Sequence, residues 1–443
     1  MKFMDNKPHR STFLALLILL ITSGNVVASE GSPLNDETSD PRNMGWMVGF
    51  PPEPSLRITQ PDSNYFSFPK LRWSVCHLRE LLPTARVRRN PYLAIPFEYA
   101  LDGGIERVTF SPMNSNNDMT WQESLSANYT DGLLILHKGK VVYEYYSGCL
   151  SEHTLHAAMS MTKSFTGLIA QILVSNGELD ETALVSSIIP ELSPSAFGDA
   201  TVRQVMNMTT ALDYSENYAD PNADIWIYSK AASPMPKAPD YDGPEGYFEY
   251  LQTVRKKGSH GDGFGYKTVN SDVLGWIIAR TTGMAFEDAV HHYLWDHLGV
   301  ENDAYITVDG LGTAFAGGGL SATLRDLGRL GQMMLDDGKV NGLQLVPEEA
   351  IDAIRRGGDK EVFAKGGFTT LAGGSYQSMW WIFHNDNGAY AARGVHGQTV
   401  YIDPTAEMVL VRLASFPVSA NSKIDPTSLP AYQAVADYLM SKN

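Results

Sequence analysis

Residues 156–167 read His-Ala-Ala-Met-Ser-Met-Thr-Lys-Ser-Phe-Thr-Gly and carry the strongest chemical signal in the chain. Ser160 and Lys163 stand three residues apart, so on a helix both side chains lie on one face and the amine can reach the hydroxyl. A serine hydroxyl becomes a good nucleophile when a neighbouring group takes its proton. The spacing therefore predicts a nucleophile and its base at the start of a helix.

The residues after Ser160 predict a helix with one apolar face, because apolar side chains recur there at helical spacing. These side chains are Met161, Phe165, Leu168, Ile169 and Ile172. Gly177 is placed to end the helix. Free backbone N–H groups and the helix dipole at the N-terminus favour a developing negative charge beside Ser160. We expect the apolar face to fix the helix in the core and the Ser160–Lys163 stripe to face a cleft.

The same spacing occurs a second time, at Ser67-Phe68-Pro69-Lys70. Pro69 disfavours a helix through Ser67, so the Lys70 amine would not be aimed at that hydroxyl. The four-residue pattern is therefore not specific by itself, and the prediction for Ser160 depends on its surroundings.

The composition is that of a globular protein. The chain has 443 residues, 43% of them hydrophobic and 19% charged, enough for one large domain or two closely packed ones. A formal net charge of -16 disfavours nucleic acid and anionic membrane as partners. The two cysteines, Cys76 and Cys149, have no C-x-x-C partner, which disfavours a zinc site and thiol redox chemistry. They could form a disulfide or remain two buried thiols. We expect no metal and no cofactor.

Residues 1–29 have the pattern of a secretory signal peptide. Positive residues precede a short apolar run, Phe13 to Ile21, and small residues follow it. The run falls short of the ~20 residues that span a bilayer, so we expect export to the periplasm or the exterior without stable membrane insertion. Residues 30–125 are expected to form an N-terminal extension on a main domain of residues 126–443, with a poorly ordered lead up to about residue 60.

Strand signals occur at both ends of the main domain. Residues 132–137 and 141–146 predict a hairpin, and residues 399–402 and 408–413 predict two more strands. The region between them, about 180–310, reads as an inserted set of helices broken by polar loops. These patterns predict an α/β fold of the α+β type, with an antiparallel sheet flanked by helices.

The stretch 156–167 resembles the active-site helix of the serine β-lactamase and penicillin-binding-protein superfamily. It is most similar to the class C-like branch, which also contains esterases and 6-aminohexanoate-dimer hydrolases. Residues 131–148 resemble the hairpin before that helix, and residues 317–327 resemble the glycine-rich turn and the helix after it. The resemblance covers about residues 131–415. It implies a β-lactamase/transpeptidase-like fold and acyl transfer through a serine.

The resemblance also implies roles for later residues. Tyr266 matches the tyrosine that shuttles a proton with the lysine, while Asn270 or Ser271 fits better as the cap of a helix over residues 273–282 that ends at Gly283.

The Lys-Thr-Gly strand of β-lactamases is matched by Ala392-Arg393-Gly394, which lacks the lysine. The N–H of Val395 would join the N–H of Ser160 as the oxyanion hole, or that of Gln398 in a shifted register. The expected substrate-binding residues are Tyr218, Trp380 and His396.

These patterns together predict a serine hydrolase that cleaves small esters or amides. The missing lysine disfavours the first alternative, a β-lactamase or D-alanyl-D-alanine carboxypeptidase. The second alternative is a non-catalytic binding protein on the same fold. No G-x-S-x-G motif is present, which disfavours an α/β-hydrolase.

Overall fold

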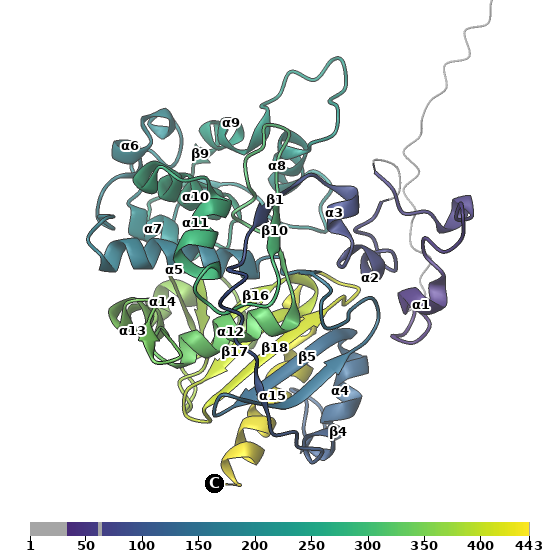
Figure 1. Ribbon diagram of the computed structural model, residues 1–443. Helices are drawn as coiled ribbons and strands as arrows, with labels where there is room; N and C mark the ends of the chain where they lie inside the picture. The colour runs from purple at the N-terminus through teal and green to yellow at the C-terminus, as the bar shows by residue number, and fades with distance from the viewer. Residues whose placement is uncertain (1–32, 61–63, 443) are drawn as a thin grey trace, which may run out of the picture. The chain divides into compact units, whose positions relative to one another are not determined.

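The computed structural model describes residues 33–60 and 64–442 (Figure 1). The signal peptide expected over residues 1–29 lies outside the described residues. The described residues from Leu34 onward form one compact unit. Within the described ranges, we find no helix with the length and apolar character needed to cross a bilayer.

The main sheet has eight strands in the order β14-β15-β16-β17-β18-β5-β6-β2. Their bounds are β2 Glu98–Tyr99, β5 Thr130–His137, β6 Lys140–Tyr146, β14 Ser375–Gln377, β15 Trp380–Ile382, β16 Tyr390–Gly394, β17 Gln398–Asp403 and β18 Met408–Ala414. Neighbouring strands are antiparallel except β2, which pairs with β6 in parallel. Strand β18 pairs with β5, so the two predicted strand pairs lie side by side and both ends of the domain build one sheet, as the sequence indicated.

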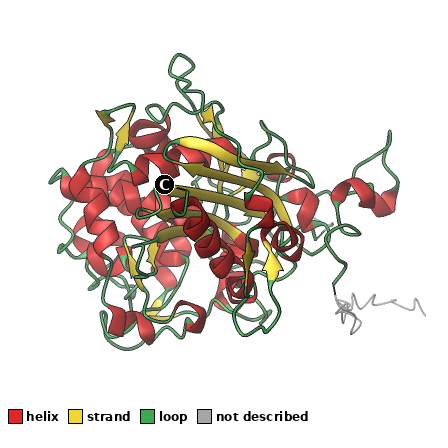
Figure 2. Ribbon diagram, turned by 90° about the horizontal axis from the view of Figure 1, so that it is seen from below, coloured by secondary structure: helices red, strands yellow, loops and turns green. Residues whose placement is uncertain are grey.

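Helices cover both faces of this sheet (Figures 1 and 2). The helices α5 (Met161–Ser175) and α12 (Leu324–Leu335) pack on one face, and α4 (Trp121–Ala127) and α15 (Asp425–Met440) pack on the other. The alternation of side chains along β5 explains both cores, because Leu134 and Leu136 enter the first and Leu133 and Ile135 the second.

The region between the strand pairs is helical. It contains α6 Val185–Ile188, α7 Val202–Met206, α8 Asp224–Ala232, α9 Gly246–Thr253, α10 Val269–Thr282 and α11 Phe286–Val290. The prediction that Asn270 or Ser271 caps the helix is wrong, because α10 begins at Val269. The Asn270 side chain instead accepts from Thr210 Oγ1 at 2.6 Å and donates to the Lys267 carbonyl at 3.0 Å. Gly283, with φ of 72°, ends α10 in the left-handed conformation as predicted.

A second sheet has four strands and contains the strand that precedes α5. Its order is β1-β10-β11-β7, with bounds β1 Thr84–Val87, β7 His156–Ala157, β10 Ala304–Thr307 and β11 Leu320–Ala322. Strand β7 ends three residues before Ser160 and pairs with β11. The extended backbone at β7 therefore turns directly into α5.

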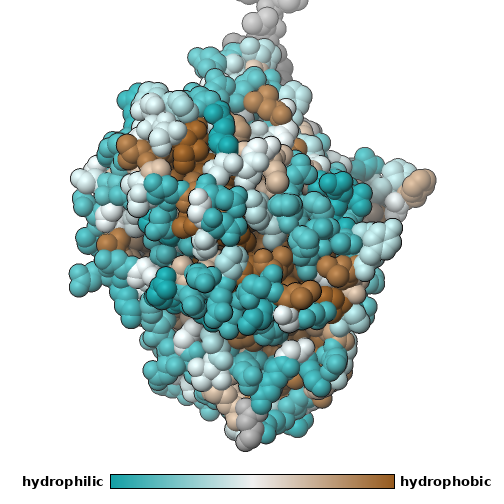
Figure 3. All heavy atoms as spheres, turned by 60° about the vertical axis from the view of Figure 1, so that its left-hand side comes forward, coloured by the Kyte–Doolittle hydropathy of each residue, from teal (hydrophilic) through white to brown (hydrophobic). Residues whose placement is uncertain are grey.

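The N-terminal segment is more structured than expected. Residues 33–60 include the helix α1, Pro41–Met44, and are not a poorly ordered lead. The fully buried Arg72 holds this segment, because its guanidinium pairs with both Asp36 and Asp131. Cys76 and Cys149 form a disulfide, which resolves the alternative that the sequence left open. The face shown in Figure 3 is largely hydrophilic, and its hydrophobic side chains lie in separate groups.

Candidate active site

The turn before α5 positions Ser160 at the helix N-terminus. Ser160 is the N-cap residue, and Met159 before it has a φ of 49°, a conformation that L-residues seldom adopt. Thr162 holds this turn, since its hydroxyl donates to the Met159 carbonyl at 2.7 Å and accepts from the Leu320 N–H at 3.1 Å. The hydroxyl-bearing residue therefore sits on a fixed turn.

The helix α5 is buried on more than its apolar face. Every residue from Met161 to Leu173 is buried, so the helix is enclosed on all sides and not on its apolar face alone. Its polar side chains bond into the protein: Ser164 donates to the Met379 carbonyl at 2.8 Å and Thr166 to the Ala316 carbonyl at 2.8 Å. The helix is thus a rigid support for Ser160 and Lys163.

Lys163 lies at hydrogen-bonding distance from Ser160. Its Nζ donates to Ser160 Oγ at 3.0 Å and to the Gly317 carbonyl, and only 1% of the residue is exposed. Burial lowers the pKa of Lys163, while the nearby carboxylates of Glu216 and Asp272 oppose this shift. A buried lysine with a lowered pKa can act as a base at neutral pH.

Tyr266 completes the group that the sequence predicted. Its hydroxyl hydrogen-bonds with Ser160, and Lys163 Nζ lies 5.3 Å from its ring centroid. Burial raises the pKa of Tyr266, so its proton is retained at neutral pH. The ring of Trp381 stacks on Tyr266 with centroids 5.3 Å apart. Lys163 and Tyr266, from two distant parts of the chain, thus meet at the Ser160 hydroxyl, and Trp381 supports the Tyr266 ring.

The C-terminal end of strand β16 lies close to the backbone of Ser160. A Cβ added at Gly394 would lie 3.0 Å from Ser160 N and 2.7 Å from the Ala158 carbonyl oxygen. Val395 follows directly, which favours the register that uses its N–H. Gln398 pairs with Gly394 in the β16–β17 ladder, so its backbone belongs to the neighbouring strand.

Arg393 stands in the strand that lacks the expected lysine. Its guanidinium forms an ion pair with Asp425 at the start of α15, and both side chains are buried. Its Cζ lies 5.7 Å from the Trp381 ring centroid. The positive charge is therefore near the site but already paired.

The three expected substrate-binding residues have different surroundings. The Tyr218 hydroxyl donates to Glu216 Oε1 at 2.9 Å. His396 is half-buried and its Nδ1 lies 2.7 Å from the Phe416 carbonyl. Trp380 is fully buried and its indole N–H donates to the Ser164 carbonyl at 3.1 Å. Trp380 is thus a core residue, and its neighbour Trp381 is the one beside Tyr266.

Two carboxylates near Lys163 were missed as site residues. Glu216 accepts hydrogen bonds from the Thr268 hydroxyl at 2.6 Å and from the Thr268 N–H. Asp272 is 2% exposed in the first turn of α10 and accepts from the Tyr228 hydroxyl at 2.7 Å. No motif marks Asp272, whereas Glu216 begins the segment 216–221, which resembles a substrate-side segment of the 6-aminohexanoate-dimer hydrolases. A single acidic residue in a helical stretch carries no signal of burial, so only a three-dimensional structure could find Asp272.

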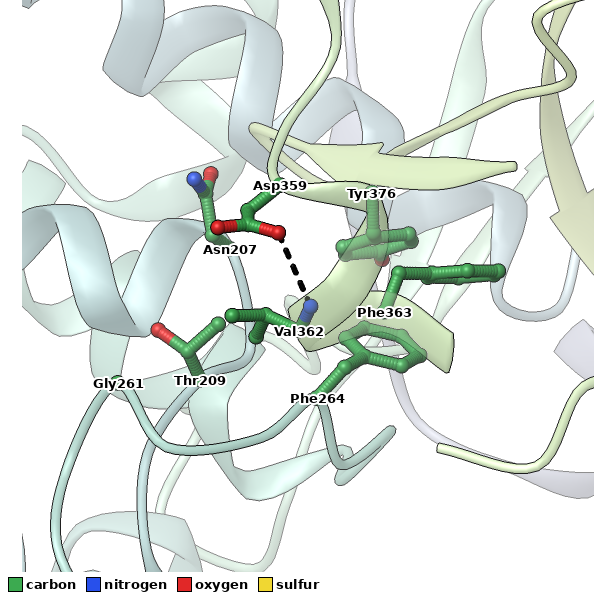
Figure 4. Close-up of a pocket in the computed structure, with 8 residues that line it drawn as sticks. All are labelled: Asn207, Thr209, Gly261, Phe264, Asp359, Val362, Phe363 and Tyr376. Atoms are coloured by element: carbon green, nitrogen blue, oxygen red, sulfur yellow. Dashed lines mark hydrogen bonds between the residues drawn. The ribbon is translucent and has the colours of Figure 1, made fainter. Parts of the chain in front are cut away.

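A cavity of about 240 Å³ lies near this site. Figure 4 shows the side chains that line it. Its lining residues are Asn207, Thr209, Gly261, Phe264, Asp359, Val362, Phe363 and Tyr376. The Tyr376 ring lies between it and Tyr266, with centroids 6.2 Å apart in an edge-to-face contact. Neither Ser160 nor Lys163 lines this cavity, so it is separate from the reacting groups.

The fold and the buried serine–lysine pair define a class of hydrolases, and the comparison with known families agrees. Residues 127–429 match the family described as Beta-lactamase, and the chain belongs to this family. The architecture is the β-lactamase/transpeptidase-like fold that the sequence predicted.

The relatives place the chain within the family. It is 36% identical over 352 residues to a 6-aminohexanoate-dimer hydrolase of Paenarthrobacter ureafaciens, covering 79% of this chain and 86% of that one. A solved structure from Bacillus anthracis, assigned to the same group of hydrolases, superimposes with a TM-score of 0.78 at 31% identity, over 85% of this chain and 96% of that one. A class C β-lactamase variant shares the fold alone, at 18% identity and a TM-score of 0.50, over 71% of this chain and 94% of that one.

Proposed function

We propose that the protein is a serine hydrolase that cleaves small amides or esters through an acyl-enzyme on Ser160. The observation that carries the proposal is the 3.0 Å contact between Lys163 Nζ and Ser160 Oγ in a buried site. Removal from water lowers the pKa of the amine, which lets it take the serine proton.

The reaction begins when Ser160 Oγ attacks the substrate carbonyl and Lys163 accepts its proton. The carbonyl oxygen gains negative charge and accepts hydrogen bonds from the N–H groups of Ser160 and Val395. Tyr266 gives its proton to the leaving nitrogen or oxygen and takes the proton held by Lys163, so the C–N or C–O bond breaks and the acyl group stays on the serine. Water then attacks the acyl-enzyme ester and gives a proton to Lys163. Tyr266 protonates Ser160 Oγ as the ester bond breaks, the proton on Lys163 restores Tyr266, and the carboxylic acid leaves.

The substrate class comes from the relatives and from the charge of the site. The curated relative is named for a small linear amide, which favours a small amide for this chain. In β-lactamases the strand lysine binds the ligand carboxylate, whereas here Ala392-Arg393-Gly394 has no lysine and Arg393 is paired with Asp425. The site therefore favours small esters and amides over β-lactams.

The test is labelling with a fluorophosphonate probe. We expect the wild type to be labelled and Ser160→Ala to remain unlabelled. An ester, amide and β-lactam panel would then rank the substrates. Labelling that survives in Ser160→Ala would contradict the mechanism. Stable acylation by penicillin together with cleavage of D-Ala-D-Ala would favour the carboxypeptidase alternative, and no labelling of the wild type would favour a binding protein.

Export is the second part of the proposal. The Cys76–Cys149 disulfide supports it, because disulfides form and persist in oxidising compartments. Expression of the full chain in a Gram-negative host should yield a periplasmic protein without residues 1–29. Full-length protein retained in the cytoplasm would contradict this prediction.

A further inference from the structure

Asp272 is a buried carboxylate that the proposed mechanism does not use. It lies in the first turn of α10 with 2% of its surface exposed. The Tyr228 hydroxyl of α8 donates to its Oδ2 at 2.7 Å, while its Oδ1 is buried without a hydrogen-bond partner among the described residues. A buried carboxylate is costly unless it is hydrogen-bonded or paired, so this arrangement needs a reason.

The contacts of Asp272 lead to the base. The carbonyl of Gly317 accepts from Lys163 Nζ, and the same residue packs against Asp272. The approach is close: a Cβ at Gly317 would lie 3.0 Å from Asp272 Oδ2 and 2.6 Å from Thr268 Cγ2. The carboxylate therefore packs against the residue whose carbonyl holds the lysine beside Ser160.

Asp272 also acts on Lys163 through its negative charge. Two carboxylates, Asp272 and Glu216, act on one buried amine, and both favour its protonated form. The other titratable groups that face Asp272 are tyrosines on neighbouring segments, namely Tyr214, Tyr228 and Tyr247. Burial raises the pKa of Asp272, and the Tyr228 hydrogen bond and the Lys163 charge oppose that rise.

We propose that Asp272 is a positioning residue, which fixes the Gly317 carbonyl over Lys163 and supplies a negative charge that controls how readily the lysine releases its proton. The inference rests on the proposed function, because it assigns Asp272 a role in the reaction of Ser160 and Lys163. It also connects α8, through Tyr228, to the base.

The experiment is the pH profile of kcat/KM for Asp272→Asn with a small ester. Loss of the negative charge makes the ammonium less stable, so the free amine appears at lower pH. The acid limb of the profile should move to lower pH by about one unit, the scale for an opposite charge a few ångströms away. At high pH, where the amine is already free, kcat should fall because the Gly317 carbonyl is held less firmly. A merely structural role would lower stability and rate without moving the limb.

The matched control is Asp403→Asn. Asp403 is also fully buried and hydrogen-bonded, to the Asn387 amide at 2.8 Å and the Ala406 N–H at 2.9 Å, but it lies at the end of β17. The acid limb of the kcat/KM profile of Asp403→Asn should lie at the same pH as that of the wild type. If Asp272→Asn does not fold, Tyr228→Phe is the second variant, because it keeps the carboxylate and removes one hydrogen-bond donor to it. The acid limb of the Tyr228→Phe profile should also move to lower pH, by less than that of Asp272→Asn.

An unmoved acid limb in a folded Asp272→Asn or Tyr228→Phe protein would overturn the inference, as would a shift to higher pH. Ser160→Ala in the same assay separates the two proposals. Hydrolysis retained by Ser160→Ala would contradict the proposed function itself. An inactive Ser160→Ala with an unmoved Asp272→Asn limb would contradict only the role of Asp272.

Discussion

Two segments of this chain share the same four-residue pattern, Ser-x-x-Lys, in different surroundings. At Ser160–Lys163 the serine caps a buried helix and the amine reaches its hydroxyl at 3.0 Å. At Ser67–Lys70 the helix α2 begins only at Leu71, and the Ser67 hydroxyl donates to the Asn64 carbonyl at 2.7 Å. The comparison shows that at Ser160–Lys163 a helix aligns the two side chains and burial removes the amine from water, whereas Ser67 lies outside a helix.

Replacing the two serines should give the largest contrast. Ser160→Ala should lower kcat/KM by about a thousandfold or more, because the covalent route is lost. Ser67→Ala should stay close to the wild type, since its hydroxyl bonds only to a local turn. Steady-state kinetics with a chromogenic ester measures both. Equal losses in the two variants would contradict the assignment.

The two lysines should differ in the same way. Lys163→Met should cost about a hundredfold or more through loss of the base, while Lys70→Met should leave the rate unchanged. The wild-type rate should rise with pH along a limb below the usual lysine range, because burial lowers the pKa of Lys163 and only the neutral amine accepts a proton. A pH–rate profile checks this, and a limb at the ordinary lysine pKa would count against Lys163 as the base.

A methyl group at Gly394 on β16 should disturb the Ser160 segment without changing a residue of either Ser-x-x-Lys pattern. Gly394 has a φ of -133°, so alanine fits its backbone, but the added Cβ would lie 2.7 Å from the Ala158 carbonyl oxygen. Gly394→Ala should lower kcat by roughly a hundredfold, the scale for losing one oxyanion donor. Gly103→Ala, where a Cβ meets nothing within 4 Å, is the control and should retain full activity.

The smallest effect on activity should come from the disulfide that ties the segment after Ser67 to the main domain. Cys76→Ser with Cys149→Ser should lower the free energy of unfolding by about 2–4 kcal/mol. The rate at 25 °C should be unchanged, because neither cysteine contacts Ser160. Denaturant unfolding and an activity assay on the same sample separate the two effects. A loss of activity in the folded variant would show that the N-terminal segment also shapes the site.

The sequence by itself determined the parts of the protein that depend on short separations. The three-residue spacing of Ser160 and Lys163, the β5–β6 hairpin and the left-handed Gly283 all follow from local geometry. The family resemblance extended this to Tyr266, whose place before a helix is also a local feature. The first three predictions held because helix and turn geometry acts over a few residues, and the role of Tyr266 stays a prediction.

The tertiary structure alone decided which side chains meet across the fold. It assigned Trp380 to the core and Trp381 to the site, paired Arg393 with Asp425, closed the disulfide, and brought Asp272 to the Gly317 turn beside Lys163. Burial and long-range contacts depend on how the two sheets and the inserted helices pack. A polar residue shows none of this in its own neighbourhood of the sequence, so the serine–lysine pair was predictable and the carboxylate behind it was not.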